Sequence, residues 1–296
     1  MLANPAVVGQ SELTDISMTG YAHTSGIRRG FIRYNNYNGQ SLNFSMALKN
    51  GKFGIGGNVI RDEIIYSKIA KFNGFFAYHK DFQFGKLSLG TSLGATNDAY
   101  DFSIFSSQSP PLIPNTGTDR YFNLGFGAMF SNKYGFISFS NPNVLDRARM
   151  IVSNGMNYTF ELSPFTRAVI SGGLRLPVFT EQLVFRPAFV YRAKFFNNDL
   201  VRLSEIHELE LNASFQIFKS FWINTSFNPY LGPLLGISQG IDVGVGYQFK
   251  KGFRILLDYG MLSYDGRFNS NTLELILGQR LNRQKNDRPY SQATFF

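Results

Sequence analysis

Apolar and polar residues alternate along most of this chain, and residues 240–281 show the pattern most clearly. At the start of this stretch every second residue is apolar or aromatic, namely Ile241, Val243, Val245, Tyr247 and Phe249. The alternation resumes after a tight turn at residues 250–252 and again after a polar loop. A period of two residues is that of a β-strand with one apolar and one polar face. The stretch therefore predicts three antiparallel strands, joined by one short and one longer connection.

The same alternation recurs about fourteen times, and the connections between segments alternate in length. Those near residues 50, 83, 133, 180, 219 and 251 are short, whereas those near residues 30, 63, 108, 153, 200, 232 and 266 are mostly longer. Asn50-Gly51 is a strong hairpin signal, because both residues tolerate positive φ. In outer-membrane barrels the short turns are periplasmic and the longer loops face outward.

We therefore predict an all-β fold, a transmembrane up-and-down antiparallel β-barrel of about 14 strands. It would occupy residues 1–282 as a single domain with both termini periplasmic, and residues 283–296 would form a polar periplasmic tail. A soluble all-β fold is the alternative, but it gives no reason for loop lengths that alternate so regularly.

Composition narrows the class of protein. No apolar run approaches the roughly 18 residues that a membrane-spanning helix needs. The chain has no cysteine, which excludes disulfides, zinc–thiolate sites and thiol catalysis. The net charge of +9 is spread over loops and strand faces, which fits loop solubility, an anionic membrane surface or an acidic partner, but not nucleic-acid binding. An outer-membrane barrel needs a signal peptide, so we expect Met1 to be an internal residue of a longer precursor.

Charged residues on the polar faces of the strands are candidates for the barrel lumen, because charges facing lipid near the midplane are costly. This set consists of Lys71, Arg175, Arg186, Arg192, Lys194, Glu210, Arg254, Asp258 and Glu274. Two interpretations remain open. The lumen is packed by salt bridges and hydrogen bonds, or it receives a peptide segment or passes a solute.

Two outer connections, residues 97–120 and 141–165, are much longer than a strand connection needs, although Met150–Leu162 could be a strand above the membrane. Both are rich in apolar residues, and exposed apolar patches often mark an interface. The predicted partner-binding residues are Tyr100, Phe102, Ile104, Phe105, Leu112, Ile113, Leu145, Met150 and Met156. The alternative is that these loops fold inward and plug the barrel.

Candidates for catalysis or metal binding are few. The histidines His23, His79 and His207 fall at different heights on different strands, so they predict no metal cluster. His207 lies beside Glu205 and Glu208, but no local motif supplies a nucleophile. No loop has calcium-binding spacing, and no glycine-rich loop opens a helix. We therefore expect a non-enzymatic protein with no catalytic residue, cofactor or metal site.

Four segments resemble, in order and spacing, motifs of the PorP/SprF family of type IX secretion membrane proteins. Asn4–Gly9 is similar to the NPAxxG segment near the mature N-terminus of that family, with Asn4, Pro5 and Gly9 at the matching positions. Lys52–Asp62 resembles its second hairpin, Gly85–Gly90 its GKLSLG strand and Phe122–Gly127 its PNFGFG strand. The resemblance covers nearly the whole chain, apart from residues 141–165.

The resemblance implies a protein of the outer membrane of Bacteroidota-type bacteria, surrounded by lipopolysaccharide. It implies support for secretion or surface attachment of large adhesins, including gliding adhesins, through the cargo's C-terminal sorting domain. Other type IX secretion components or periplasmic motor components are further expected partners, and nucleic acid is not. The alternative is a diffusion porin or a hydrophobic-solute transporter, with the charged residues lining an open pore.

Overall fold

The computed structural model describes residues 4–11, 13–25, 28–29, 32–33, 37–49, 51–64, 67–101, 116–144, 150–153, 156–159, 167–178, 180–194, 206–218, 220–231, 239–264 and 267–281. A short 3-10 helix, η1 (Pro5–Val7), precedes the strands. Within the described ranges, no helix is long and apolar enough to cross a membrane.

The strands of the main sheet are β1 (Thr14–Ser25), β4 (Tyr37–Leu48), β5 (Phe53–Ile64), β6 (Ser67–Phe82), β7 (Gly85–Asp101), β8 (Thr116–Ser131), β9 (Gly135–Asn141), β12 (Arg167–Leu174), β13 (Leu176–Val178), β14 (Thr180–Lys194), β15 (Ile206–Ile217), β16 (Phe221–Leu231), β17 (Gln239–Gln248), β18 (Phe253–Tyr264) and β19 (Arg267–Leu281). Two small ribbons form separate sheets, one of β2 (Arg28–Arg29) with β3 (Ile32–Arg33) and one of β10 (Met150–Ser153) with β11 (Met156–Thr159).

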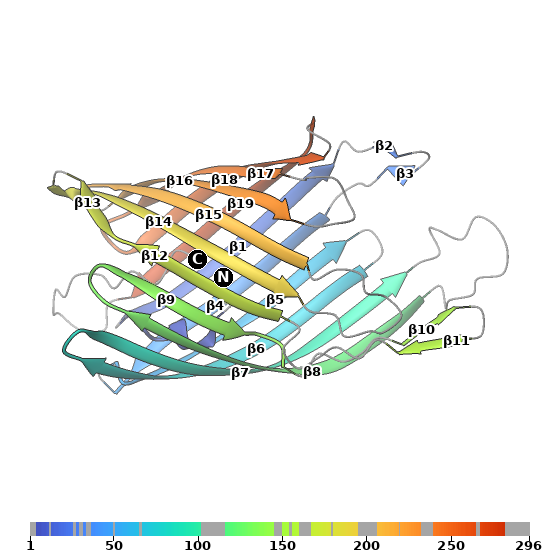
Figure 1. Ribbon diagram of the computed structural model, residues 1–296, viewed down its shortest axis with the longest axis horizontal. Coiled ribbons are helices and arrows are strands. Elements are labelled where there is room, and N and C mark those ends of the chain that lie inside the picture. Colours follow the sequence, from blue (N-terminus) through green and yellow to red (C-terminus); the bar gives the residue numbers. More distant parts are fainter. Residues whose placement is uncertain are drawn as a thin grey trace.

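The main sheet closes into a barrel (Figure 1). The first strand, β1, pairs with β4 on one side and with the last strand, β19, on the other, and Thr14 lies opposite Leu281. On the far side of the ring, β12 pairs with both β9 and β14. Since β12 and β13 are two parts of one strand interrupted at Arg175, the wall has fourteen antiparallel strands. The predicted fold is confirmed, whereas the periplasmic position of the termini stays a prediction.

Side chains alternate between the outer and inner faces of the wall. On β8, Phe122 is 72% exposed whereas its neighbour Asn123 is 6% exposed. On β6, Phe76 is 47% exposed, whereas Ala77 is fully buried. An apolar outer face with a polar or small-residue inner face is the reverse of a soluble barrel, and it suits a wall covered by lipid.

Several strands run well beyond the predicted boundaries. Residues 97–120 were expected to be one loop, but β7 continues to Asp101 and β8 begins at Thr116, with Asn97 opposite Arg120 in the ladder. The expectation was wrong there because a strand outside the hydrocarbon layer needs no apolar face, while its backbone still gains from antiparallel pairing. Within the second predicted loop, β10 and β11 form a short hairpin.

Aromatic residues and lysines gather at the end of the barrel that carries the short turns. Three lysine ammonium groups lie over aromatic rings there, Lys49 over Phe53 at 5.7 Å, Lys80 over Phe82 at 5.2 Å and Lys133 over Tyr134 at 4.8 Å. Amphipathic aromatic rings and long cationic side chains suit the boundary between lipid and water. This rim therefore marks one edge of the membrane-embedded belt.

Candidate functional site

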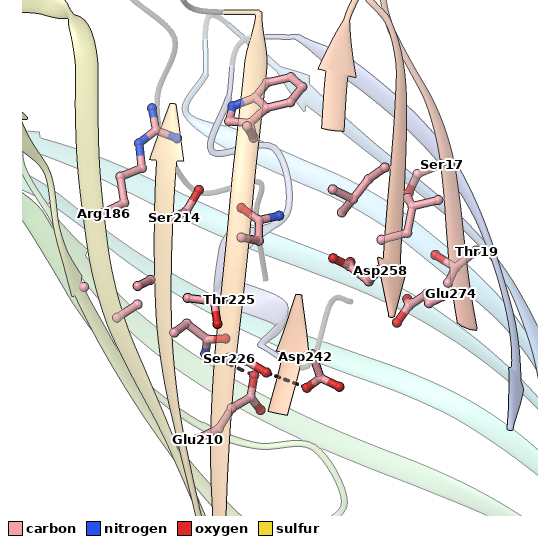
Figure 2. Close-up of a pocket in the computed structure, with 18 of the residues that line it drawn as sticks. Ser17, Thr19, Arg186, Glu210, Ser214, Thr225, Ser226, Asp242, Asp258 and Glu274 are labelled. Carbon is pink, nitrogen blue, oxygen red and sulfur yellow. Dashed lines mark hydrogen bonds between the residues drawn. The ribbon is translucent and has the colours of Figure 1, made fainter. Parts of the chain in front are cut away.

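The barrel interior holds a cavity of about 430 Å³, which we call the lumenal cavity. Residues of β14 to β19, β1, β4, β9 and β12 line it, together with Val7 and Ser11 of the N-terminal segment, residues 4–11. Figure 2 shows charged and hydroxyl side chains from several of these strands around the same space. Five of the predicted lumen residues line it, namely Arg186, Glu210, Arg254, Asp258 and Glu274.

Three carboxylates on adjacent strands form the acidic side of the cavity. Asp258 on β18 lies opposite Glu274 on β19 in the ladder, and Asp242 comes from β17. The Ser226 hydroxyl donates a hydrogen bond of 2.5 Å to Asp242. A Cβ added at Gly244 would overlap the Asp258 carboxylate, and one added at Gly260 would overlap the Asp242 carboxylate. These two glycines therefore leave room for the acidic side chains. The sequence prediction omitted Asp242, although its position in the alternation already places it on the inner face.

Most of the other charges around the cavity are paired. Arg192 lies 2.8 Å from Glu210, and the Arg186 guanidinium donates a 2.5 Å hydrogen bond to Gln216. Asp15 accepts from two arginines, Arg254 at 2.6 Å and Arg280 at 3.2 Å, and all three side chains are at most 12% exposed. The sequence prediction missed Asp15 and Arg280, because pairing across the junction of the first and last strands has no local signal.

Lys71 and Arg175, two further predicted lumen residues, are not among the residues that line this cavity. Lys71 is half-buried on the inward face of β6, alternating with outward Phe72. Arg175 lies at the break between β12 and β13, where its backbone N–H donates to the Tyr134 carbonyl at 2.7 Å. Lys194 is the last residue of β14, and its side chain lies outside the described part of the structure.

The N-terminal segment lies against the inner wall opposite the lumenal cavity. Pro5, Ala6 and Val8 are buried, and Val8 packs with Phe75 and Ala77 of β6. Contacts of η1 extend over β6, β7 and β8. The segment therefore occupies part of the lumen beside the short-turn end.

Polar contacts tie this segment to three strands, β4, β8 and β9. The Asn4 side-chain amide donates to the Ala128 carbonyl at 3.4 Å and to the Phe139 carbonyl at 3.3 Å. The Gly9 N–H donates to the Ser45 hydroxyl at 2.9 Å, and the Gln10 amide donates to the Ser131 hydroxyl at 2.7 Å. The family-motif residues Asn4, Pro5 and Gly9 thus belong to a folded element inside the barrel, a role that the sequence prediction did not include.

His79 of β6 links the segment to the wall. It is 2% exposed, with Nε2 at 2.9 Å from the Val8 carbonyl oxygen and Nδ1 at 2.8 Å from the Ser88 hydroxyl. Because a carbonyl oxygen only accepts, Nε2 carries the hydrogen of the first bond. His207 contacts Tyr191 through its Nδ1, at 2.5 Å. Among the described residues, no group of three His, Cys, Asp or Glu side chains could hold a metal ion.

Of the nine predicted partner-binding residues, three belong to strands that the structure describes. Phe102, Ile104, Phe105, Leu112, Ile113 and Leu145 lie outside the described residues. Tyr100 belongs to β7, and Met150 and Met156 begin β10 and β11, but their side chains are outside the described part. The interface therefore stays a prediction.

Solved structures with a similar fold are outer-membrane-type barrels. A Pseudomonas aeruginosa FadL homologue is 10% identical with a TM-score of 0.56, over 94% of this chain and 93% of that chain. The Pseudomonas putida toluene transporter TodX is 10% identical with a TM-score of 0.56, over 94% and 92%. The Acinetobacter baumannii outer membrane protein Omp33 is 8% identical with a TM-score of 0.51, over 92% and 100%. At such identities the likeness shows the fold alone.

No curated protein matches the sequence. The model of one family, described as type IX secretion system membrane protein PorP/SprF, matches residues 1–278. That match spans η1, both small ribbons and the whole wall except the last three residues of β19. The lipid-facing belt and the family together support an outer-membrane location. The chain is therefore a member of the PorP/SprF family of type IX secretion system membrane proteins.

Proposed function

We propose that this barrel is a non-enzymatic component of type IX secretion that holds or helps to export a large secreted adhesin by recognising the cargo's C-terminal domain. The family match over residues 1–278 is the observation that carries the proposal. The wall closes because its first strand, β1, pairs with its last strand, β19, so the barrel is a continuous platform in the membrane. Its contribution to secretion would be to bind the cargo and to position it.

The size of the lumen supports contact with cargo outside the barrel. The lumenal cavity of about 430 Å³ is of the size that accommodates a small molecule or a few side chains. A folded C-terminal domain does not fit into such a space. We therefore assign cargo recognition to the outer connections that follow β7 and β9, where the apolar residues Phe102 and Phe105 are candidate contacts.

Co-purification tests the proposal. The native protein, extracted in mild detergent, should bring down a large secreted protein or other type IX components. Phe102→Ser with Phe105→Ser should reduce retention of the surface protein while the barrel stays heat-modifiable on a gel. Phe82→Ser with Phe84→Ser, at the opposite rim where both rings are exposed, is the matched control and should retain the cargo. Recovery of the barrel alone, under conditions that preserve other secretion complexes, would contradict the proposal.

A second candidate function is that of a diffusion porin or a hydrophobic-solute transporter, which the lumenal cavity favours because both charged and apolar side chains line it. The carboxylates and hydroxyl groups of the cavity would then contact a solute that crosses the outer membrane through the barrel. Planar-bilayer recordings of the purified barrel separate the two functions. A large steady conductance supports the channel, whereas a silent barrel that co-purifies with cargo supports the secretion role.

A further inference from the structure

The N-terminal segment is held in the lumen as a bound peptide would be. We propose that the inner wall of β5 to β8 is a peptide-binding site for a short Asn-Pro turn segment, that residues 4–11 are its resident ligand, and that this ligand narrows the lumen. The inference goes beyond the proposed secretion role and does not depend on it, because it concerns contacts within the barrel.

The wall is shaped to the segment by small residues on neighbouring strands. A Cβ added at Gly54 would overlap the Val8 carbonyl, one at Gly90 would overlap Pro5, and one at Gly127 would overlap the Asn4 side chain. Between them, Ala77 of β6 is fully buried under Val8. We call the surface formed by Gly54, Gly90, Gly127 and Ala77 the glycine groove. Any larger side chain at the three glycines would exclude the peptide.

Polar groups of the wall recognise the peptide at defined points. His79 donates to the Val8 carbonyl, and Ser45 accepts from the Gly9 N–H. The Asn4 amide reaches backbone carbonyls on two adjacent strands, while its oxygen accepts from the Ala6 N–H at 2.9 Å and starts the turn. Gly9 has φ of 69°, and an added Cβ would overlap Gly54, so a glycine is required there. The site therefore selects an Asn-Pro turn followed by small apolar residues and glycine.

These contacts need no covalent link between the segment and the barrel. They are hydrogen bonds and packing contacts to β4, β5, β6, β7, β8 and β9. Val7 and Ser11 also border the lumenal cavity, so removal of the segment enlarges the open space. A separate peptide with the sequence of residues 4–11 should therefore bind and restore the narrower lumen.

The test compares the full chain with a variant that lacks residues 4–11, both reconstituted in planar bilayers. We expect the deletion to raise single-channel conductance several-fold, and a synthetic NPAVVGQS peptide to bring it back to the level of the full chain. A peptide with Ala in place of Asn4 should bind about tenfold more weakly, since it loses buried hydrogen bonds. Unchanged conductance on deletion, or equal rescue by a scrambled peptide, would overturn the inference.

Two substitutions in the deletion variant test where the peptide binds. Gly90→Leu should abolish rescue by the peptide, because the new side chain fills the position of Pro5. Gly20→Leu is the matched control, since a Cβ there meets no atom within 4 Å, and it should leave rescue intact. Rescue that survives Gly90→Leu would refute the assignment of the groove.

A substitution in the full chain provides a second test, which applies even if the variant that lacks residues 4–11 does not fold. The chain has no cysteine, so Ala6→Cys gives a single thiol in a fully buried position. We expect that thiol to react slowly with a water-soluble maleimide, and to react about tenfold faster when Asn4→Ala is added. Equal labelling rates in the two variants would show that Asn4 does not hold the segment in the groove, and would overturn the inference.

Discussion

Loss of the Asp15 carboxylate should weaken the barrel where its first and last strands meet. Asp15 on β1 accepts from Arg254 on β18 and Arg280 on β19, and the exposed fractions of the three side chains are 9%, 12% and 8%. Asp15→Asn removes the negative charge that lies between the two guanidinium groups. In the variant, the two buried guanidinium groups lose the carboxylate that they share.

The size of the effect follows from that burial. Removing one partner of a buried ion pair typically costs about 3–5 kcal/mol, because the remaining charge stays desolvated. We expect the free energy of unfolding of Asp15→Asn to fall by that amount. An exposed pair provides the matched control, since Lys68 and Glu63 lie 3.0 Å apart with the Lys68 side chain 65% exposed. Lys68→Met should change stability by less than about 1 kcal/mol.

Urea unfolding in lipid vesicles, followed by the fluorescence of the single tryptophan, measures both variants. A triple variant separates charge from packing, because Asp15→Leu, Arg254→Met and Arg280→Met together remove the charges and keep apolar volume. Replacement of whole buried ion clusters is often close to neutral, so the triple variant should recover most of the stability. If Asp15→Asn costs no more than Lys68→Met, the three side chains do not stabilise the junction of β1 and β19 as reasoned.

Further predictions concern the membrane, the orientation and one turn. Phe76→Arg places a charge on the lipid-facing side of β6, so it should lower the free energy of unfolding by about 2–4 kcal/mol in the same urea assay. A cysteine replacing Ser109 should be labelled on intact cells and one replacing Lys52 should not, and the reverse result would invert the orientation. Gly252 has φ of 85°, so Gly252→Ala should cost about 1–3 kcal/mol, and an unchanged urea midpoint would contradict that strain.

The sequence contains most of the information on the wall. Alternation alone predicts strands such as β17 and β18, because lipid on one side and lumen on the other act on every second residue. Strand ends are different. At Asn97 and Asp98 both faces are polar, so the pattern disappears although the ladder of β7 and β8 continues. The physical reason is that exposure to lipid requires apolar side chains, whereas pairing of the backbone does not depend on side-chain polarity.

The interior could be predicted only in part. The alternation of apolar and polar positions predicted that Asp258 and Glu274 face inward. In the structure both side chains line the lumenal cavity. The N-terminal segment has no strand period, so nothing local indicates that it turns back into the lumen. The sequence does contain one signal for this contact, the inward glycines Gly54, Gly90 and Gly127. They lie on three different strands, at positions where all three can contact the same segment. Reading that signal requires the register of the sheet, which the sequence alone does not supply.

The pairing of β1 with β19 has a consequence for assembly. Thr14 and Leu281 are direct partners, although nearly the whole chain separates them. Such non-local pairing is slow, because the entropy of closing a long loop is lost before any contact forms. Until the final strand has been synthesised and exported, the growing sheet keeps two unpaired edges that can join other chains. Closure of the wall therefore waits for its last strand, and until then the unclosed chain has to be kept from pairing with other chains.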